Sequence, residues 1–377
     1  MKKFLKYSGV VLAVIIALTY AFGYDYLFKG VAKTYLRGET SATIDDGTLF
    51  PKHTILAENP KPWIKDSLYN KKPLPKNLIE NLKKTQTASF IVVKNGKLLY
   101  EDYWDSYHQN SKTNSFSIAK TVTALLLGAA ISDGKIKSEN QKFSDFYPEF
   151  DGSEFGKSLT LKNLVTMEAG LDWDESYQSP FSPNAKAYYG NSLADAVLGV
   201  KVKEMPGRKF EYQSGATQLL GFAIRKAVQM PIASYASKKL WNPLGMEQNA
   251  DWTTDEYGME KTFCCIQSNS RDFAKLGLLM LNEGKVDSLQ IINKDYIQKM
   301  IAPTSESAGN YGYGIWTNYK NEYPYYYFRG ILGQYIVIVP QEKLVIVRTG
   351  NDENIETDKY GHPKLVNLMI KEMVENY

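Results

Sequence analysis

The chain has 377 residues, 44% hydrophobic and 23% charged, which is typical of a globular protein with one large domain or two smaller ones. Its 45 basic and 41 acidic residues nearly balance, and no basic block occurs, so nucleic acid is not an expected partner. The three histidines show no metal-ligand spacing, so we expect no metal site, and nothing else in the sequence implies a cofactor. The two cysteines, Cys264 and Cys265, are adjacent, and we expect them to be small buried apolar residues rather than a disulfide.

The N-terminus carries a membrane signal. Lys2, Lys3 and Lys6 precede an uncharged stretch, Tyr7–Tyr24, whose eighteen residues are enough for a spanning helix. Because the basic flank comes first, the positive-inside rule places the rest of the chain outside the cytoplasm. We therefore expect residues 1–6 to be cytoplasmic, residues 7–24 to be a transmembrane signal-anchor, and the remainder to be periplasmic or extracellular. Cleavage of this segment as a signal peptide, followed by secretion, is the alternative.

Residues 25–85 are dotted with prolines and predict an extracytoplasmic arm in front of one domain, residues 86–377. In that domain, two apolar runs, Ser89–Val93 and Leu98–Tyr100, flank an Asn-Gly turn and predict a β-hairpin. An apolar run beginning at Ser117 predicts a long helix that stops at the next Asp-Gly pair. The domain is thus expected to open with a hairpin followed by a helix.

The rest of the domain changes from helices to strands. A helix-rich middle is expected at about residues 135–300, with helices at Gly215–Val228 and Ser270–Asn282. Strands are expected at Gly312–Trp316, Tyr325–Gly330, Gln334–Val339 and Leu344–Thr349, and a closing amphipathic helix at Lys364–Glu375. Early strands, a helical middle and late strands predict an α+β fold, with one antiparallel sheet built from both chain ends and flanked by helices.

Ser117 and Lys120 form the first candidate for a reactive site. They lie one turn apart at the start of the apolar helix, so their side chains share one face. A hydroxyl beside an amine is one way to build an activated nucleophile. Lysine is rarely buried in so hydrophobic a helix, so its presence there favours a catalytic role. The alternative is a plain core helix with Ser117 as its N-cap.

Two further motifs favour the reactive site. Tyr212-Gln213-Ser214 stands on a turn just ahead of a second apolar helix, and glycines in Arg329–Gln334 would let a substrate lie against backbone amides. Together with Ser117 and Lys120, these motifs resemble the serine β-lactamase and penicillin-binding protein-like hydrolase superfamily. The resemblance is to its class C-related branch, and within it to the 6-aminohexanoate-dimer hydrolase type. It covers roughly residues 85–350 and implies the β-lactamase/DD-peptidase-like fold.

The resemblance implies a role for each matching residue. Ser117 matches the nucleophile that is acylated, and Lys120 and Tyr212 match the pair that handles protons. The amides of Ser117 and Ile331 match the oxyanion hole. The residues that match substrate-contacting positions are Tyr177, Ser214, Gln267 and Gly333.

The sequence departs from this family at the third motif. Penicillin-recognising members usually carry a cationic residue there, whereas this chain reads Ile331-Leu332-Gly333. Arg329 is close, but we expect it to point to the other face of the sheet. Because the missing cation normally helps to hold a substrate carboxylate, we expect an uncharged small-molecule ester, amide or short peptide as substrate.

Proton transfer sets a physical requirement on Lys120. A free lysine has a pKa of about 10.4, and acting as a base near neutrality needs a fall of about three units. Deep burial can supply this fall. We expect Lys120 and Tyr212 to act as one coupled base, since a neighbouring cation favours the phenolate. Two alternatives stay open: a DD-peptidase or β-lactamase that recognises penicillins, and a non-catalytic binding or sensing module of the same fold.

Overall fold

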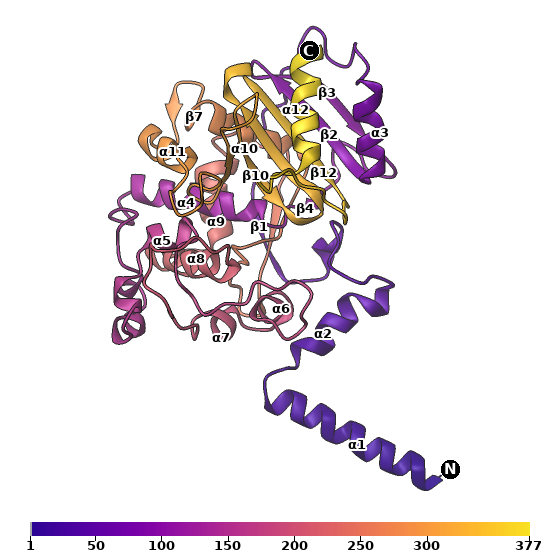
Figure 1. The fold of residues 1–377 in the computed structure, drawn as a ribbon, viewed down its shortest axis with the longest axis vertical. Helices are drawn as coiled ribbons and strands as arrows, with labels where there is room; N and C mark the ends of the chain where they lie inside the picture. The colour runs from indigo at the N-terminus through magenta and orange to yellow at the C-terminus, as the bar shows by residue number, and fades with distance from the viewer. Residues whose placement is uncertain (1) are drawn as a thin grey trace.

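The computed structural model describes the backbone of residues 2–377 and the side chains from residue 7 onward, residue 12 excepted. Its centre is a six-stranded antiparallel sheet with the strand order β3-β2-β12-β11-β10-β9 (Figure 1). The strands are β2 (Thr87–Lys94), β3 (Lys97–Tyr103), β9 (Trp316–Asn318), β10 (Tyr325–Gly330), β11 (Gln334–Val339) and β12 (Leu344–Gly350). Because the late strand β12 pairs directly with the early strand β2, the predicted sheet built from both chain ends is confirmed.

Helices cover both faces of this sheet (Figure 1). On one face lie α4 (Ile118–Ser132) and α10 (Ser270–Leu281), and on the other lie α3 (Lys76–Lys84) and α12 (Lys364–Asn376). Alternate residues of β2 therefore point into two cores, Ile91 into the α4 side and Val92 into the α12 side. Because both faces are covered, the strands are apolar along their length rather than at every second residue.

The middle of the chain forms a mostly helical subdomain below the sheet in Figure 1. Its helices are α5 (Leu161–Val165), α6 (Pro183–Tyr189), α7 (Leu193–Val197), α8 (Ser214–Val228) and α9 (Ile232–Ala236). The helix α11 (Lys294–Ile301) lies beside the six-stranded sheet, next to α4 (Figure 1). Beside the helices of the subdomain lies a second sheet with the order β1-β5-β6-β4. Its strands are β1 (Lys52–Ile55), β4 (Thr113–Asn114), β5 (Ala250–Thr253) and β6 (Ile266–Ser268).

This second sheet corrects part of the prediction for residues 135–300. The helices are there, but β5 and β6 also fall inside that range, as does a small hairpin of β7 (Lys285–Val286) and β8 (Leu289–Gln290). These strands contain only two to four residues each. Segments so short cannot show the period of two by which a strand is recognised in a sequence.

Most other predicted elements are present, with small shifts at their ends. The Asn95-Gly96 turn between β2 and β3 is left-handed at both residues (φ 51° and 75°), as this type of hairpin requires. The predicted strand at Gly312–Trp316 is wrong, because β9 begins only at its last residue. Gly314 is left-handed (φ 68°), and a Cβ on it would lie 2.8 Å from Ala124 of α4. This segment therefore turns against α4 instead of extending.

The expected arm at residues 25–85 is shorter than predicted. β1 pairs with β5, and α3 packs against α12, so the chain from about residue 52 belongs to the folded body. Before that point lies α2 (Tyr26–Lys33), and the chain that follows it, with two short 3-10 helices, also contacts the body, since Ile44 is fully buried against Phe116. The physical reason is that the prolines of this region separate short elements that pair with the body, rather than keeping the chain away from it.

The first helix, α1 (Lys2–Ala21), extends away from the body at the lower right of Figure 1. Across the described residues, no single helix is both long and apolar enough to cross a membrane. Tyr7–Ala21 and Tyr26–Arg37 meet that criterion only as a pair, and the two are bent by 108°. The side chains of residues 1–6, on whose lysines the expected orientation depends, lie outside the described ones. The membrane anchor therefore stays a prediction.

Candidate active site

Ser117, just before α4, is partly exposed, while the residues that follow it are buried. Phe116 before it takes a left-handed φ of 43°, a conformation that costs about 1–3 kcal/mol in a bulky residue. Two hydrogen bonds hold the turn: the Phe116 amide donates to Asn114 Oδ1 at 3.0 Å, and the Ser115 amide donates to Ile266 O at 2.9 Å. Ser117 makes no side-chain bond that caps its own helix, so its hydroxyl is free for other partners.

Lys120 lies inside the body, with only 2% of its surface exposed. Its Nζ lies 3.0 Å from Ser117 Oγ, 3.1 Å from Ser214 Oγ and 2.8 Å from Phe263 O. Burial lowers the pKa of Lys120 to about 8, although the negative charge of Glu175 acts in the opposite direction. A sizeable part of the amine is therefore neutral at mildly alkaline pH and can accept a proton.

Tyr212 completes the group around Lys120. Its ring centroid lies 5.0 Å from Lys120 Nζ and 5.7 Å from the ring of Trp316. Burial raises the pKa of the phenol well above its ordinary value, and a side-chain hydrogen bond with Ser117 offsets this only in part. The phenol is therefore protonated at neutral pH. The expectation that Lys120 and Tyr212 act as one coupled base stays a prediction, and burial, the largest influence on the phenol, disfavours the phenolate.

Glu175 is a member of the site that the sequence analysis missed. Ser214 donates to it twice, from its amide to Oε2 and from its hydroxyl to Oε1, both at 2.6 Å. The phenol of Tyr177 and the indole of Trp173 donate to the same carboxylate at 2.7 and 2.8 Å. Glu175 thereby fixes the hydroxyl that faces Lys120 and places a negative charge near the amine. Its signal in the sequence was a carboxylate standing between two aromatic donors, Trp173 and Tyr177.

The second candidate for an oxyanion donor is the amide of Ile331, the first residue of η7 (Ile331–Gly333) between β10 and β11. A Cβ on Gly330 would lie 2.5 Å from Ser115 O, so this end of β10 lies directly against the turn before Ser117. Ile331 opens its helix and Ser117 precedes α4, so neither amide has a partner within a helix. Neither donates to another group in the described turns and loops, which leaves both available to an oxyanion.

Arg348 supports this loop from inside the protein. It is fully buried, and its Nη1 donates to Leu332 O at 2.9 Å and to Gly333 O at 2.8 Å. Leu332 is left-handed (φ 57°), which a leucine adopts only where its surroundings impose it. Burial lowers the pKa of Arg348 to about 10, so the guanidinium is still charged at neutral pH. A buried cation therefore holds the loop that carries Ile331.

Two further residues lie at the outer edge of the site. Tyr177 is 56% exposed although its hydroxyl is hydrogen-bonded. The Arg329 guanidinium donates to Gly361 O at 3.1 Å and lies 5.2 Å from the ring of Trp316. Arg329 thus points to the α12 face of the sheet, as expected. Its charge nevertheless reaches the site, where it acts to lower the pKa of Tyr212.

Two residues predicted to contact substrate lie behind other groups. Gln267 is 4% exposed, and a Cβ on Gly47, in the N-terminal segment, would lie 2.9 Å from its side chain. Gly333 is buried, and the guanidinium of Arg348 lies directly against it. Ser214, predicted to contact substrate as well, is 2% exposed and contacts the Lys120 amine instead. The structure places Gln267 under the N-terminal segment and Gly333 against Arg348.

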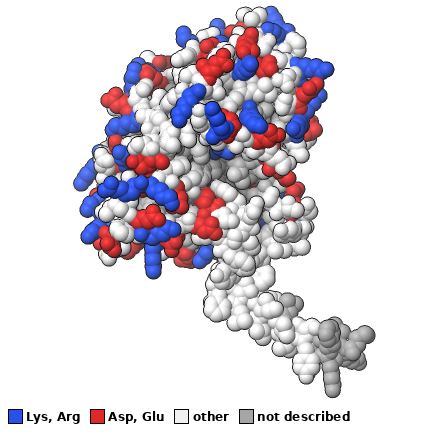
Figure 2. All heavy atoms as spheres, viewed as in Figure 1, with Lys and Arg blue, Asp and Glu red and all other residues white. Residues whose placement is uncertain are grey.

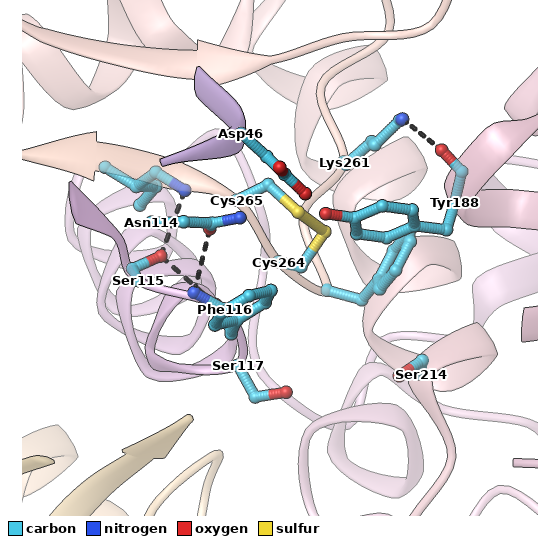
Figure 3. Close-up of a disulfide and its surroundings, with 12 residues drawn as sticks. Asp46, Asn114, Ser115, Phe116, Ser117, Tyr188, Ser214, Lys261, Cys264 and Cys265 are labelled. Atoms are coloured by element: carbon cyan, nitrogen blue, oxygen red, sulfur yellow. Dashed lines mark hydrogen bonds between the residues drawn. A yellow bond between two sulfur atoms is a disulfide. The ribbon is translucent and has the colours of Figure 1, made fainter. Parts of the chain in front are cut away.

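Cys264 and Cys265 are joined by a disulfide (Figure 3), so the expectation that they stay unlinked is wrong. Cys265 has a left-handed φ of 76°, and this unusual backbone turn lets the two adjacent side chains meet. Figure 3 shows the bond beside the turn that carries Ser117. The residue before the pair, Phe263, supplies the carbonyl that accepts from Lys120. The disulfide therefore belongs to the loop that completes the surroundings of the amine.

Comparisons with known proteins show the family to which the chain belongs. The sequence profile of the β-lactamase family matches residues 76–368. The chain belongs to the β-lactamase family. It is 23% identical over 277 residues to a 6-aminohexanoate-dimer hydrolase of Paenarthrobacter ureafaciens, covering 70% of this chain and 69% of that protein. It is also 28% identical over 171 residues to protein flp of Staphylococcus aureus, covering 42% of this chain and 33% of that protein.

Solved structures share the fold of this β-lactamase family member. A Bacillus anthracis protein assigned as a 6-aminohexanoate-dimer hydrolase matches with a TM-score of 0.74 and 22% identity, over 90% of this chain and 93% of that one. A class C β-lactamase mutant matches with a TM-score of 0.59 and 18% identity, over 80% and 96% of the two chains. The fold is thus that of the β-lactamases and penicillin-binding proteins, as predicted. The protein is a serine hydrolase of the β-lactamase and dimer-hydrolase type.

Replacing Glu175 by Gln should lower kcat and shift the acidic limb of the kcat/KM profile to lower pH. A glutamine NH2 cannot accept, so a donor of Ser214, Tyr177 or Trp173 loses its partner. Losing a charge-assisted bond of about 1.5–3 kcal/mol corresponds to a fall in rate of about ten- to hundredfold. The shift follows because the negative charge that raises the pKa of Lys120 is gone. Initial rates on an ester against pH would measure both effects.

The matched control is Asp174→Asn, which removes the same charge from an exposed side chain one residue away. It should leave both kcat and the pH profile unchanged. An unshifted profile in the Glu175→Gln variant, equal to that of the control, would contradict the assignment of Glu175 to the Lys120 network.

Replacing Arg348 by Met should lower kcat by about a hundredfold with little change in KM, comparable to the loss of one oxyanion donor. The carbonyls of Leu332 and Gly333 lose their donor, so the loop no longer holds the Ile331 amide in place. Binding of a boronic acid that mimics the tetrahedral intermediate should weaken in parallel. Arg348→Lys, which keeps a charged donor, should recover part of both. If boronate affinity is unchanged while kcat falls, Arg348 does not position the oxyanion loop.

Proposed function

We propose that this serine hydrolase cleaves an ester or amide through an acyl-enzyme formed on Ser117. The observation that carries the proposal is the Lys120 amine, which is buried, has its pKa lowered to about 8 and lies 3.0 Å from the Ser117 hydroxyl oxygen. An amine so perturbed is suited to act as the base that activates the hydroxyl.

In the acylation step, neutral Lys120 takes the proton of Ser117 while Oγ attacks the substrate carbonyl carbon. The developing oxyanion accepts from the amides of Ser117 and Ile331. The Tyr212 phenol, which is protonated at neutral pH, gives its proton to the leaving oxygen or nitrogen. The Lys120 ammonium then returns a proton to the phenol, so both groups regain their starting forms and one alcohol or amine is released. Lys120 and Tyr212 are therefore a base and an acid that share one proton.

In the deacylation step, the same pair acts on water. Neutral Lys120 accepts a proton as water attacks the acyl carbon, and the oxyanion again accepts from the two amides. Collapse of this intermediate breaks the bond to Ser117 Oγ, which regains a proton. The products are the carboxylic acid and the free enzyme, and no cofactor is required.

The substrate we propose is an uncharged small ester, amide or short peptide. The absence of a cation at Ile331-Leu332-Gly333 argues against a required carboxylate, and the exposed ring of Tyr177 offers an aromatic rim. The name of the Paenarthrobacter relative, a 6-aminohexanoate-dimer hydrolase, supports a short linear substrate. A penicillin-recognising DD-peptidase or β-lactamase is the second candidate, favoured by the fold shared with class C β-lactamases.

We further propose that residues 7–24 anchor the protein in a membrane, with the hydrolase domain outside the cytoplasm. The uncharged stretch that follows the basic flank supports this proposal, as do the exposed apolar side chains of α1. A cleaved and secreted form is the alternative for this segment.

A fluorophosphonate should label the protein covalently, and Ser117→Ala should abolish both the labelling and ester hydrolysis. The matched control is Ser132→Ala, because Ser132 ends the same helix and is also followed three residues later by a lysine, Lys135. Its hydroxyl bonds only to Gly128 O, so this variant should label like the wild type. Labelling that survives in Ser117→Ala would refute the nucleophile. Competition by benzylpenicillin would favour the penicillin-recognising alternative.

The value of kcat/KM should rise with pH and level off above about pH 8, because only the neutral amine accepts a proton and burial lowers the pKa of Lys120 to about 8. Below that pH Lys120 is charged, and the rate should fall about tenfold per pH unit, as expected for one essential base. Tyr212 keeps its proton throughout this range, so it should add no second limb. A profile that is flat between about pH 6 and about pH 9 would exclude Lys120 as the essential base.

A further inference from the structure

Helix α2 and the 3-10 turn after it, η1 (Tyr35–Arg37), expose an apolar face. Phe28, Val31, Tyr35 and Leu36 are 41%, 44%, 65% and 78% exposed. Phe28 and Val31 lie one turn apart on α2, and Tyr35 and Leu36 follow on η1 after the C-cap of the helix, Thr34. We call these four residues the α2 outer face.

The charged residues of α2 point the other way, into the protein. Lys29 donates to Asn191 and forms an ion pair with Glu256 at 3.1 Å. Lys33 donates to Leu49 O and lies 4.2 Å from the ring centroid of Phe50.

Tyr26, at the start of α2, and Gly30, between the two lysines, also face the body. Tyr26 is 2% exposed, and a Cβ on Gly30 would lie 3.6 Å from the ring of Tyr189. The helix is therefore fixed to the body through its polar side.

A helix on a water-exposed surface normally turns its apolar side chains inward and its charged side chains outward. The orientation of α2 is the opposite. Moving the large apolar side chains of the α2 outer face out of water is favourable. In the view of Figure 2, charges are spread over the body, whereas the described atoms of the narrow lower part show almost none. The face therefore fits an apolar environment and not water.

The apolar surface continues from α2 in two directions. Toward the N-terminus, the ring of Phe28 stacks on Tyr20 at 5.9 Å, and α1 beyond it exposes Val14, Ile15 and Leu18. Toward the body, Tyr24 contacts Phe181, which is 65% exposed, at 5.8 Å. The body itself thus adds an aromatic side chain to this surface.

Phe181 also ties this surface to the catalytic rim. The next residue, Ser182, donates to Ser176 O at 2.8 Å, which closes a loop that begins beside Tyr177. The exposed Tyr177 ring and the exposed Phe181 ring therefore belong to one short loop.

We propose that the α2 outer face and Phe181 lie in the interfacial region of a lipid bilayer, with α2 parallel to the membrane surface and α1 entering it at the bend of 108°. This inference rests on the membrane anchor of the proposed function and goes beyond it, because it docks the hydrolase domain itself on the lipid. Amphipathic helices lie in this way with their apolar side in the acyl boundary, and aromatic residues favour the same depth. Lipid is the occupant because the face is continuous with the apolar helix α1, and because both lysines of α2 turn toward the body. Arg37, the exposed residue that follows Leu36, can reach the lipid headgroups.

Nitroxide labels on the full-length protein in phosphatidylcholine vesicles would test the docking. The described chain has no free cysteine, so Val31→Cys and Leu36→Cys each introduce one reactive thiol. Their labels should be several-fold more accessible to oxygen, and several-fold less accessible to a water-soluble nickel chelate, than a label at the exposed Lys157. Nickel access equal to that at Lys157 would overturn the proposal.

The other outcomes separate the competing explanations. Vesicle flotation with labels open to nickel would keep the anchor and refute the docking, whereas failure to float would refute both. Spin–spin broadening that appears only in nanodiscs with two copies would assign the face to a second copy of the chain and overturn lipid as its occupant. Fluorophosphonate labelling of Ser117 on the same samples reports the hydrolase chemistry independently of these results.

Discussion

The Lys120 side chain contacts oxygens on three separate segments while only 2% of its surface is exposed. An ammonium group in such a place is costly unless it is paired, and here no carboxylate touches it among the described residues. The fall of its pKa from 10.5 to about 8 corresponds to about 3 kcal/mol in favour of the neutral amine. The rest of the site is arranged around this buried, easily deprotonated amine.

Two helix N-termini converge on Lys120 and strengthen the effect. Ser117 stands just before α4 and Ser214 is the first residue of α8, and both hydroxyl oxygens lie within 3.1 Å of Nζ. The positive ends of both helix dipoles therefore point toward the amine, which disfavours its charged form and favours an oxyanion nearby. Glu175 accepts from the amide and hydroxyl of Ser214, so it balances this positive potential and keeps that hydroxyl turned to its partners. The N-termini of α4 and α8 thus both favour the neutral form of Lys120 and stabilise an oxyanion.

The sequence was sufficient to predict the elements with long periodic patterns and the residues with a fixed spacing. Ser117 and Lys120 share one helix face, so their proximity follows from helix geometry alone. Glu175 was missed because its partner Ser214 on α8 is distant along the chain, and the aromatic donors beside it, Trp173 and Tyr177, are a weak signal by themselves. The role of Arg348 could not be predicted, because its bond to Leu332 O forms only when β12 packs behind the oxyanion loop. β5 and β6 are too short to show a period, and adjacent cysteines bond only because one backbone turn is left-handed.

The N-terminal segment links the proposed membrane surface to the catalytic turn. Ile44 is fully buried in a small cluster with Phe116, and Ile331 and Leu332 pack against that cluster. The amide of Asn114, on the strand before the nucleophile, donates to Ile44 O at 2.8 Å. Both oxyanion segments therefore contact a stretch that precedes the matched family domain, which begins at residue 76. Since the same stretch leads back to α2, the position of that helix and the shape of the oxyanion hole are set by one continuous piece of chain.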